Sequence, residues 1–198
     1  MSPVGYLPLF IFVTVSTMTP GGATTLAAAS GTHFGLRGSV PLIGGQSAGL
    51  AAMAASAAAG LAGILLALPS LQLVMRAVGS VYLLWLAWKI GTSGAPHLST
   101  SIAKPAHFLE GVWLLWSNPK AWATTLSAAA SFASLANSPL QLAILLGFAF
   151  GVAATVSLSL WCTAGLLLAR LLRSEMQWRI LNVALAALLT TSIPPMWF

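Results

Sequence analysis

The stretch TPGGATTLAAAS, Thr19 to Ser30, decides the fold, because it returns in the second half of the chain as NPKAWATTLSAAAS, Asn118 to Ser131. Each copy places a proline inside a long apolar segment, and Ala-Thr-Thr-Leu and a run of small residues follow that proline. In a membrane protein, interrupted helices in corresponding halves of the chain point to a transporter's binding site. The repeat therefore predicts two broken helices around one site.

The composition predicts an integral membrane protein in contact with lipid. Of the 198 residues, 58% are hydrophobic and 5% are charged, and the mean hydropathy is +0.92. A soluble protein of this size needs a polar surface over its core, which this composition does not supply. The net charge of +6 comes from scattered residues without a basic face, which argues against nucleic-acid binding.

The apolar residues fall into six segments near the length of about 20 residues that a spanning helix needs. The segments are Tyr6 to Ala29, Pro41 to Leu66, Leu71 to Ile90, Phe108 to Leu135, Leu140 to Ala169 and Trp178 to Pro194. We expect an all-α membrane fold of six transmembrane helices, with proline breaks in the first and fourth. The chain is then one membrane domain, 1–198, with repeat one at 1–90, a linker at 91–105 and repeat two at 106–198.

The positive charges set the expected orientation, since short cytoplasmic loops are enriched in Lys and Arg. Connections one, three and five hold Arg37, Lys89, Lys104, Arg170, Arg173 and Arg179, whereas connection two holds only Arg76. This pattern predicts a multi-pass protein with both termini outside. Three crossings per half then make the second repeat inverted relative to the first, an architecture on which alternating access is built. The first segment lacks a basic n-region, which favours a retained helix over a signal peptide.

The first break frees backbone groups inside the membrane. Pro20 cannot donate a backbone hydrogen bond, and Gly21 and Gly22 remove side chains where the helix bends. The hydroxyls of Thr24 and Thr25 are close enough in sequence to bond some of these groups. A helix that restarts after Gly22 would present N–H groups and a positive dipole end, which favour a carboxylate. The alternative is a plain proline kink that helix packing satisfies.

The second break adds a cation. Lys120 follows Asn118 and Pro119 near the middle of the fourth segment, where insertion scales give a lysine a cost of roughly 2.5 to 3.5 kcal/mol. Such residues usually face a polar interior and mark a substrate or ion path. The alternative is snorkelling from a helix that begins nearer Trp116. Asn118 can cap the restarted helix or bind a ligand.

Two GxxxG motifs predict close helix packing, Gly45 with Gly49 and Gly147 with Gly151. Gln46 lies inside the first motif. It is the best neutral polar candidate for lining the site, and its alternative role is an interhelical hydrogen bond.

No catalytic or metal site is expected, and the sequence predicts a protein that is not an enzyme and binds no cofactor. The chain has no aspartate, and its acids are Glu110 and Glu175. His33, His97 and His107 lack acidic partners at ligand spacing. Intramembrane metalloproteases and similar enzymes need such clusters to hold a metal or move protons. The lone Cys162 excludes an intramolecular disulfide and a thiolate metal cage.

Six motifs occur in order along nearly the whole chain. They are TPGG at Thr19 to Gly22, GLRGS at Gly35 to Ser39, GGQSAGL at Gly44 to Leu50, GSVYLLWLAWK at Gly79 to Lys89, FLEGVWLLWSNPKA at Phe108 to Ala121, and LG at Leu146 to Gly147. As a set they resemble the LysE/RhtB-type superfamily of amino-acid exporters. The resemblance implies a bacterial inner-membrane, six-helix secondary exporter that uses an ion gradient, with H⁺ as the expected coupling ion.

The chain also departs from that family's pattern. Members often read TPGP with a following asparagine, where this chain has Gly22, Ala23 and Thr24. Many carry an aspartate in the fifth helix, where this chain offers only Thr155, Ser157 and Ser159. These departures leave open how a proton would be coupled.

The sequence as a whole predicts an exporter of amino acids, neutral ones by preference, because Lys120 has no evident carboxylate beside it. The expected substrate-binding residues are Pro20, Gly21, Gly22, Thr24, Thr25, Gln46, Asn118, Pro119 and Lys120. One alternative is a non-transporting membrane scaffold. Another is a cation or metal exporter, for which acidic and thiol ligands are scarce. A homodimer through small-residue faces is compatible with the sequence.

Overall fold

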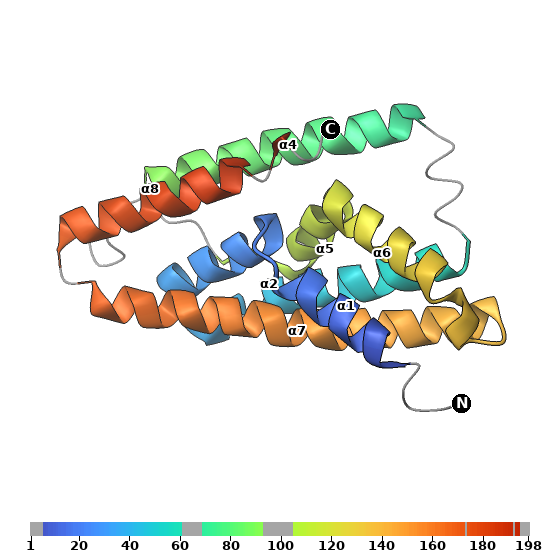
Figure 1. Ribbon diagram of the computed structural model, residues 1–198. Coiled ribbons are helices and arrows are strands. Elements are labelled where there is room, and N and C mark those ends of the chain that lie inside the picture. Colours follow the sequence, from blue (N-terminus) through green and yellow to red (C-terminus); the bar gives the residue numbers. More distant parts are fainter. Residues whose placement is uncertain (1–5, 61–68, 93–104, 173, 192, 195–198) are drawn as a thin grey trace.

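The computed structural model describes residues 6–60, 69–92, 105–172, 174–191 and 193–194. Across these residues the chain is helical and contains no strand, which confirms the all-α prediction. Figure 1 shows α1 (Leu7–Met18), α2 (Gly22–Ala58), α4 (Pro69–Gly91), α5 (Phe108–Trp116), α6 (Pro119–Ser131), the 3₁₀ turn η2 (Ala133–Leu135), α7 (Pro139–Leu171) and α8 (Glu175–Thr191). Six crossings in two inverted repeats remain a prediction.

Both predicted proline breaks are present. The first lies between α1 and α2, which are bent by 56° relative to each other. The second lies between α5 and α6, where Pro119 takes the first helical position, at which a missing N–H has no consequence. The first and fourth predicted segments are therefore each built from two helical pieces.

α2 contains the junction between the first two predicted segments. Gly35 lies within it with a φ of 67°, a left-handed conformation that glycine adopts without strain. The hydroxyls of Ser30 and Ser39 are 2.7 Å apart across this kink. α2 then ends at Ala58, before the predicted end at Leu66, because Gly60 has a φ of 82° and stops the helix. Residues 61–66, and most of the predicted linker 91–105, lie outside the described residues.

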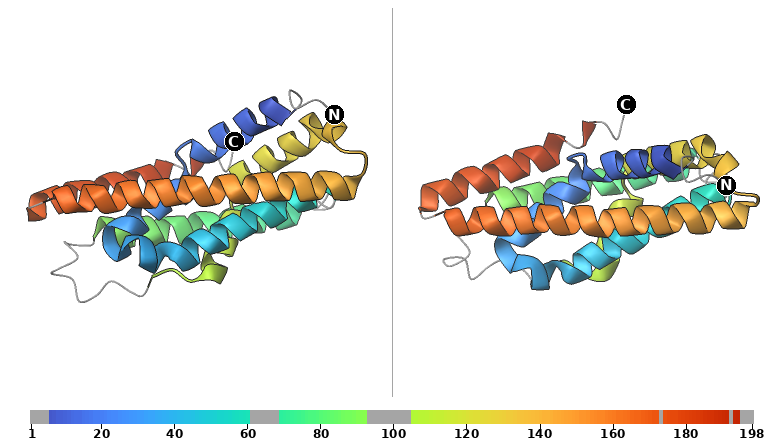
Figure 2. Two further views of the ribbon diagram at one scale, coloured as in Figure 1. Left: turned by 90° about the horizontal axis from the view of Figure 1, so that it is seen from below. Right: turned by 60° about the horizontal axis from the view of Figure 1, so that its bottom comes forward.

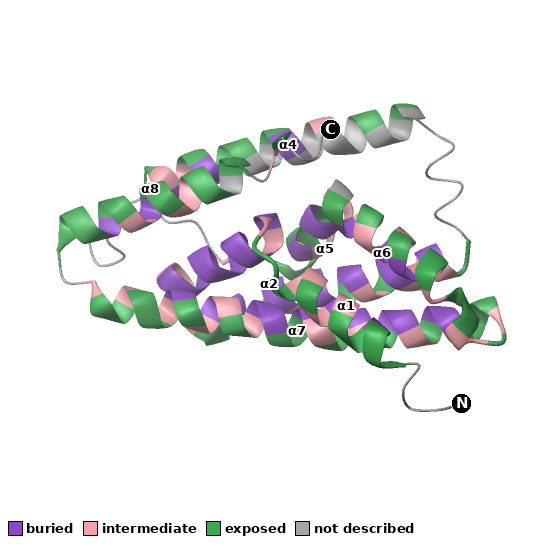
Figure 3. Ribbon diagram, in the orientation of Figure 1, coloured by how far each residue is buried: buried purple, intermediate pink, exposed green. Residues whose placement is uncertain are grey.

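The helices form two groups. α7 runs along most of the molecule and packs against α2, which also contacts α5 and α6, and Figure 2 shows this arrangement from two further directions. α4 and α8 pack against each other on one side of the other helices. Buried residues on facing sides of α2 and α7 make up most of the larger core, and Figure 3 shows the outward faces exposed.

The helices meet backbone to backbone near Gly35 and the C-terminal part of α7, which we call the Gly35 end. Four glycines there lie so close to a neighbouring helix that an added Cβ would overlap a carbonyl oxygen. The pairs are Gly45 with Phe108, Gly111 with Leu42, Gly31 with Cys162, and Gly165 with Ala28. Farther along, Gly147 and Gly151 would place a Cβ 3.2 and 3.1 Å from atoms of Ala51, so both GxxxG motifs act in packing as predicted.

The opposite end of the molecule, near Pro139, is hollowed. A hollow of about 500 Å³ is lined by Ala57, Ala58, Leu126, Ala129, Ala130, Ala133, Ala136, Asn137, Ser138, Pro139 and Leu142. We call this side the Pro139 end. Backbone contacts between helices therefore close the Gly35 end, whereas the Pro139 end contains a hollow.

Apolar side chains also cover the outside. Trp88 on α4 and Phe148 on α7 are each 73% exposed, and an apolar surface of this kind suits contact with lipid. By length and composition, α7 can cross a membrane alone, and the bent pair α1 and α2 qualifies as a second candidate.

Candidate functional site

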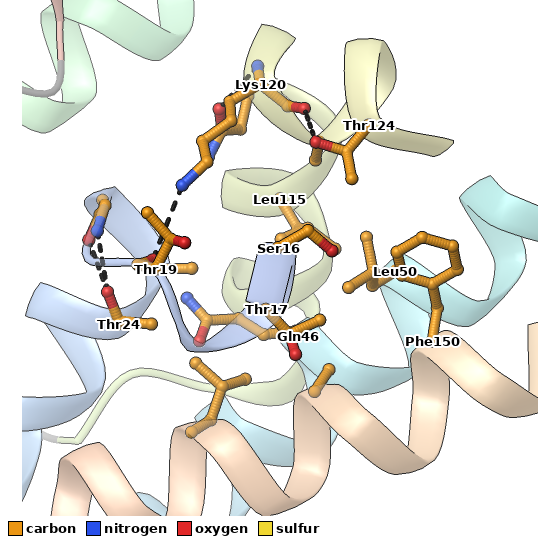
Figure 4. A pocket seen from close by; sticks show the side chains of 17 residues that line it. Ser16, Thr17, Thr19, Thr24, Gln46, Leu50, Leu115, Lys120, Thr124 and Phe150 are labelled. Carbon is orange, nitrogen blue, oxygen red and sulfur yellow. Dashed lines mark hydrogen bonds between the residues drawn. The ribbon is translucent and has the colours of Figure 1, made fainter. Parts of the chain in front are cut away.

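The two breaks meet around a cavity. The ammonium Nζ of Lys120, on α6, lies 3.5 Å from the carbonyl oxygen of Thr19 and 3.5 Å from that of Pro20. The cavity beside it has a volume of about 70 Å³, enough for a few water molecules. It is lined by Ser16, Thr17, Thr19, Gly21, Gly22, Ala23, Thr24, Gln46, Leu50, Leu115, Asn118, Lys120, Ala121, Thr124, Phe150, Ala154 and Leu158, and Figure 4 shows it from close by.

Side chains from the second half of the chain satisfy the backbone of the first break. The hydroxyl of Ser157 donates to the carbonyl of Thr17 at 2.8 Å, and the indole N–H of Trp161 donates to that of Met18 at 3.3 Å. Lys120 reaches the next two carbonyls. Because hydrocarbon offers no hydrogen bonds, these contacts let the chain break its helix without leaving those carbonyls unpaired.

The start of α2 faces the same cavity. The N–H of Gly21 donates to the hydroxyl of Thr24 at 2.8 Å, and that hydroxyl also lies 3.0 Å from the carbonyl of Gly21. Gly22, Ala23 and Thr24 line the cavity in the first turn of the helix, where N–H groups have no partner within the helix. The cavity wall therefore carries the partial positive charge of a helix N-terminus.

Lys120 has donor capacity left. Its two hydrogen bonds, at 3.5 Å, are at the outer limit for such bonds, and an ammonium has three donors. Lys120 is exposed and lines the cavity. α5 spans Phe108–Trp116 and α6, which carries Lys120, begins at Pro119, so the snorkelling alternative stays open.

Asn118 caps α6. Its side-chain oxygen accepts a hydrogen bond from the N–H of Lys120 at 3.0 Å, which confirms the capping role. The residue also lines the cavity. Its contact with a ligand remains a prediction.

Gln46 is the polar group deepest in the wall. Its side chain is 1% exposed, and neither its amide nitrogen nor its amide oxygen has a hydrogen-bond partner. Its amide atoms therefore do not form the interhelical hydrogen bond expected as an alternative, and the residue lines the cavity.

The other predicted site residues differ in whether they contribute to the cavity. Pro20 contributes its carbonyl to Lys120, whereas Thr25 is buried in α2 and does not line the cavity. Pro119 begins α6, and its side chain lies outside the described residues.

Sequence reasoning missed part of the site. Leu50, Leu115, Phe150, Ala154 and Leu158 form an apolar wall, and Ser157 and Trp161 hold the first break. Ser157 stood out only as a hydroxyl in the fifth segment, and nothing in the sequence pairs it with Thr17.

Within the described residues, no group of three or more His, Cys, Asp or Glu residues is placed to hold a metal ion. Lys120 is the only ionisable side chain among the residues that line the cavity. The site can therefore bind an anion through a positive charge and N–H groups, next to a neutral amide and an apolar surface.

Comparison with known proteins gives a consistent result. The family model described as LysE type translocator matches residues 14–191. Cysteine/O-acetylserine efflux proteins of Escherichia coli (strain K12), Salmonella typhimurium and Shigella flexneri are each 28% identical over 189 residues, which cover 96% of this chain and 95% of each relative. No solved structure matches the chain.

Proposed function

Because this chain belongs to the LysE type translocator family, we propose that it exports small, uncharged amino acids across the bacterial inner membrane. The similar proteins named as cysteine/O-acetylserine efflux proteins support a substrate of this size and charge. The observation that carries the proposal is the meeting of the two helix breaks at Lys120 and the start of α2.

The substrate's carboxylate binds at this meeting point. Lys120 supplies a full positive charge, and the first turn of α2 supplies N–H groups and a dipole. Both groups face one cavity, so a single carboxylate can contact both. The apolar wall accommodates the carbon atoms of the side chain.

The charges around the cavity favour amino acids with an uncharged side chain. No carboxylate lines it, so a lysine or arginine side chain would find no counter-ion there. A second carboxylate, as in glutamate, would compete for Lys120. Zwitterions with one carboxylate and a neutral side chain avoid both costs.

Alternating access is the proposed transport cycle, with the two broken halves as inverted repeats. The unequal closure of the Gly35 end and the Pro139 end supports it, because one end can open while the other stays shut. We propose H⁺ as the coupling ion, carried by Lys120 as the ionisable group that lines the cavity.

Lys120→Met tests the carboxylate site. The purified protein in proteoliposomes preloaded with L-serine should exchange it for external radiolabelled L-serine, and we expect Lys120→Met to lose this exchange while it elutes as a folded protein. Lys89→Met is the matched control, since Lys89 on α4 lies 4.8 Å from the centre of the Trp85 ring, away from the cavity. Wild-type exchange by Lys120→Met would contradict the assignment.

The proposed orientation has its own test. Ser174 and Asn137 are both exposed, in the connections after α7 and before it. In intact cells, a membrane-impermeant maleimide should label Asn137→Cys from outside but not Ser174→Cys. The wild-type protein is the control, because its Cys162 is buried. Labelling of Ser174→Cys alone would reverse the topology.

A further inference from the structure

The amide of Gln46 is a buried polar group that the carboxylate site does not use. Of the cavity-lining residues that the structure describes, only Gln46 has buried side-chain nitrogen or oxygen atoms without a partner. A buried amide without hydrogen bonds is strongly disfavoured, so native structures normally give it a partner. The cavity is where that partner can enter.

The geometry points to Gln46 as the residue that selects the substrate's side chain; this inference rests on the proposed export function. Lys120 enters the cavity from α6, and in the view of Figure 4 Gln46 lies below it. A zwitterion whose carboxylate is held at Lys120 and the start of α2 has its side chain left to meet the remaining wall. That wall consists of Gln46 and the apolar residues.

The surroundings of Gln46 define what that side chain must look like. Leu50 is one helical turn farther along α2 and therefore on the same face. It lines the cavity together with Phe150 and Leu158. A substrate side chain thus needs a short apolar stem that packs against these residues and a polar group that reaches Gln46.

The chemistry of a primary amide defines the polar group. Gln46 offers two N–H donors and one carbonyl acceptor, and it carries no charge. A hydroxyl or amide group can donate to the carbonyl of Gln46 and accept from its N–H groups, and an ester can accept from the N–H groups, whereas a purely apolar side chain leaves both polar atoms unpaired. The selected class is therefore small α-amino acids whose side chain bears an uncharged hydrogen-bonding group.

Matched pairs of amino acids test this selection. Threonine and valine have nearly the same shape, as do asparagine and leucine, and only the first member of each pair can bond an amide. Each is added as a competitor of L-serine exchange in proteoliposomes, and the ratio of inhibition constants within a pair is measured. We expect the wild type to favour the polar member by about tenfold or more, because the apolar member cannot form a hydrogen bond with the buried amide and leaves it unsatisfied.

Gln46→Met keeps the length of the side chain and removes both hydrogen-bonding atoms. It should bring the ratio within each pair close to one, and L-serine exchange should weaken but stay measurable, because Lys120 and the start of α2 still hold the carboxylate. Ser47→Ala is the matched control, because Ser47 is a neighbouring buried residue whose hydroxyl also has no partner but does not line the cavity. This control should keep the wild-type ratios.

Gln46→Glu gives an independent readout if Gln46→Met does not fold. The new carboxylate supplies a counter-ion, so we expect L-lysine to compete with L-serine in this variant and not in the wild type. Unchanged pair ratios in folded Gln46→Met, equal loss of every competitor, or no effect of L-lysine on folded Gln46→Glu would overturn the selection role. Failure of the wild type to exchange any amino acid would instead overturn the proposed function.

Discussion

The hydroxyl of Ser157, in the middle of α7, donates a hydrogen bond of 2.8 Å to the carbonyl of Thr17 in the last turn of α1. One turn along α7, Trp161 donates to the carbonyl of Met18. α7 therefore donates hydrogen bonds to carbonyls in the last turn of α1. Lys120 donates to the carbonyls of the two residues that follow. The first break is an assembled feature of both halves of the chain.

Ser157→Ala should destabilise the protein, because it leaves the Thr17 carbonyl unpaired in an apolar surrounding. An unsatisfied buried group costs about 1–3 kcal/mol, which lowers the melting temperature measured in detergent. Thr155→Val is the control, since the Thr155 hydroxyl bonds only to Gly151 within its own helix. Equal melting temperatures for the two variants would show that the Ser157 bond contributes nothing.

Gly45→Ala should prevent correct packing of α2 and α5, because the added methyl would overlap the backbone of Phe108. Backbone atoms cannot move aside as a flexible side chain can. We expect strongly reduced yield of folded protein by fluorescence-detected gel filtration. Gly44→Ala is the matched control, because its methyl would lie 3.7 Å from the Phe108 ring, an ordinary contact. The prediction fails if both variants elute alike.

His33 should make stability depend on pH. It lies between the first two predicted spans, and burial lowers its pKa below the usual 6.5, which the side chain of Asn182 partly opposes. The unfolded chain then binds a proton at a higher pH than the folded one, so stability is complete above about pH 6.5 and falls as the pH drops below it.

His33→Gln should reduce this loss of stability on acidification. The measurement is the melting temperature in detergent between pH 7.5 and pH 5. His107→Gln, at an exposed histidine, is the control and should leave the pH profile as in the wild type. If the melting temperature of His33→Gln still falls steeply on acidification, the loss of stability arises from another group.

Lys120→Arg should separate exchange from coupling. The guanidinium keeps the positive charge for the carboxylate but does not release a proton. We expect L-serine exchange to remain measurable while accumulation driven by a pH gradient is lost. pH-driven accumulation at the wild-type level would exclude Lys120 as the proton carrier.

The sequence predicts the helical fold, both breaks and the packing role of the GxxxG motifs, because proline, glycine and apolar length act locally. It also places Lys120 and Gln46 in one site. It does not reveal that Ser157 and Trp161 cap the first break, since that depends on how α7 is rotated against α1. Thr25 illustrates the same limit: it adjoins Thr24 in sequence, yet the turn of the helix points it into the core.

Two of the close glycine contacts involve partner residues that no glycine motif identifies. Gly31 and Gly165 approach the backbones of Cys162 and Ala28, which are not glycines and belong to no GxxxG motif. Their closeness follows from the crossing of α2 and α7, a property of the folded chain.

The unequal closure of the two ends has a consequence for the speed of transport. At the Pro139 end, a hollow lined by side chains of α2, α6 and α7 is already present, so we expect side-chain rearrangement to open that end. At the Gly35 end, contacts between backbones must separate before the cavity is exposed. Rotamer changes are faster than collective helix motions. We therefore expect substrate release through the Pro139 end to be fast. Renewed substrate loading through the Gly35 end should then limit the turnover rate.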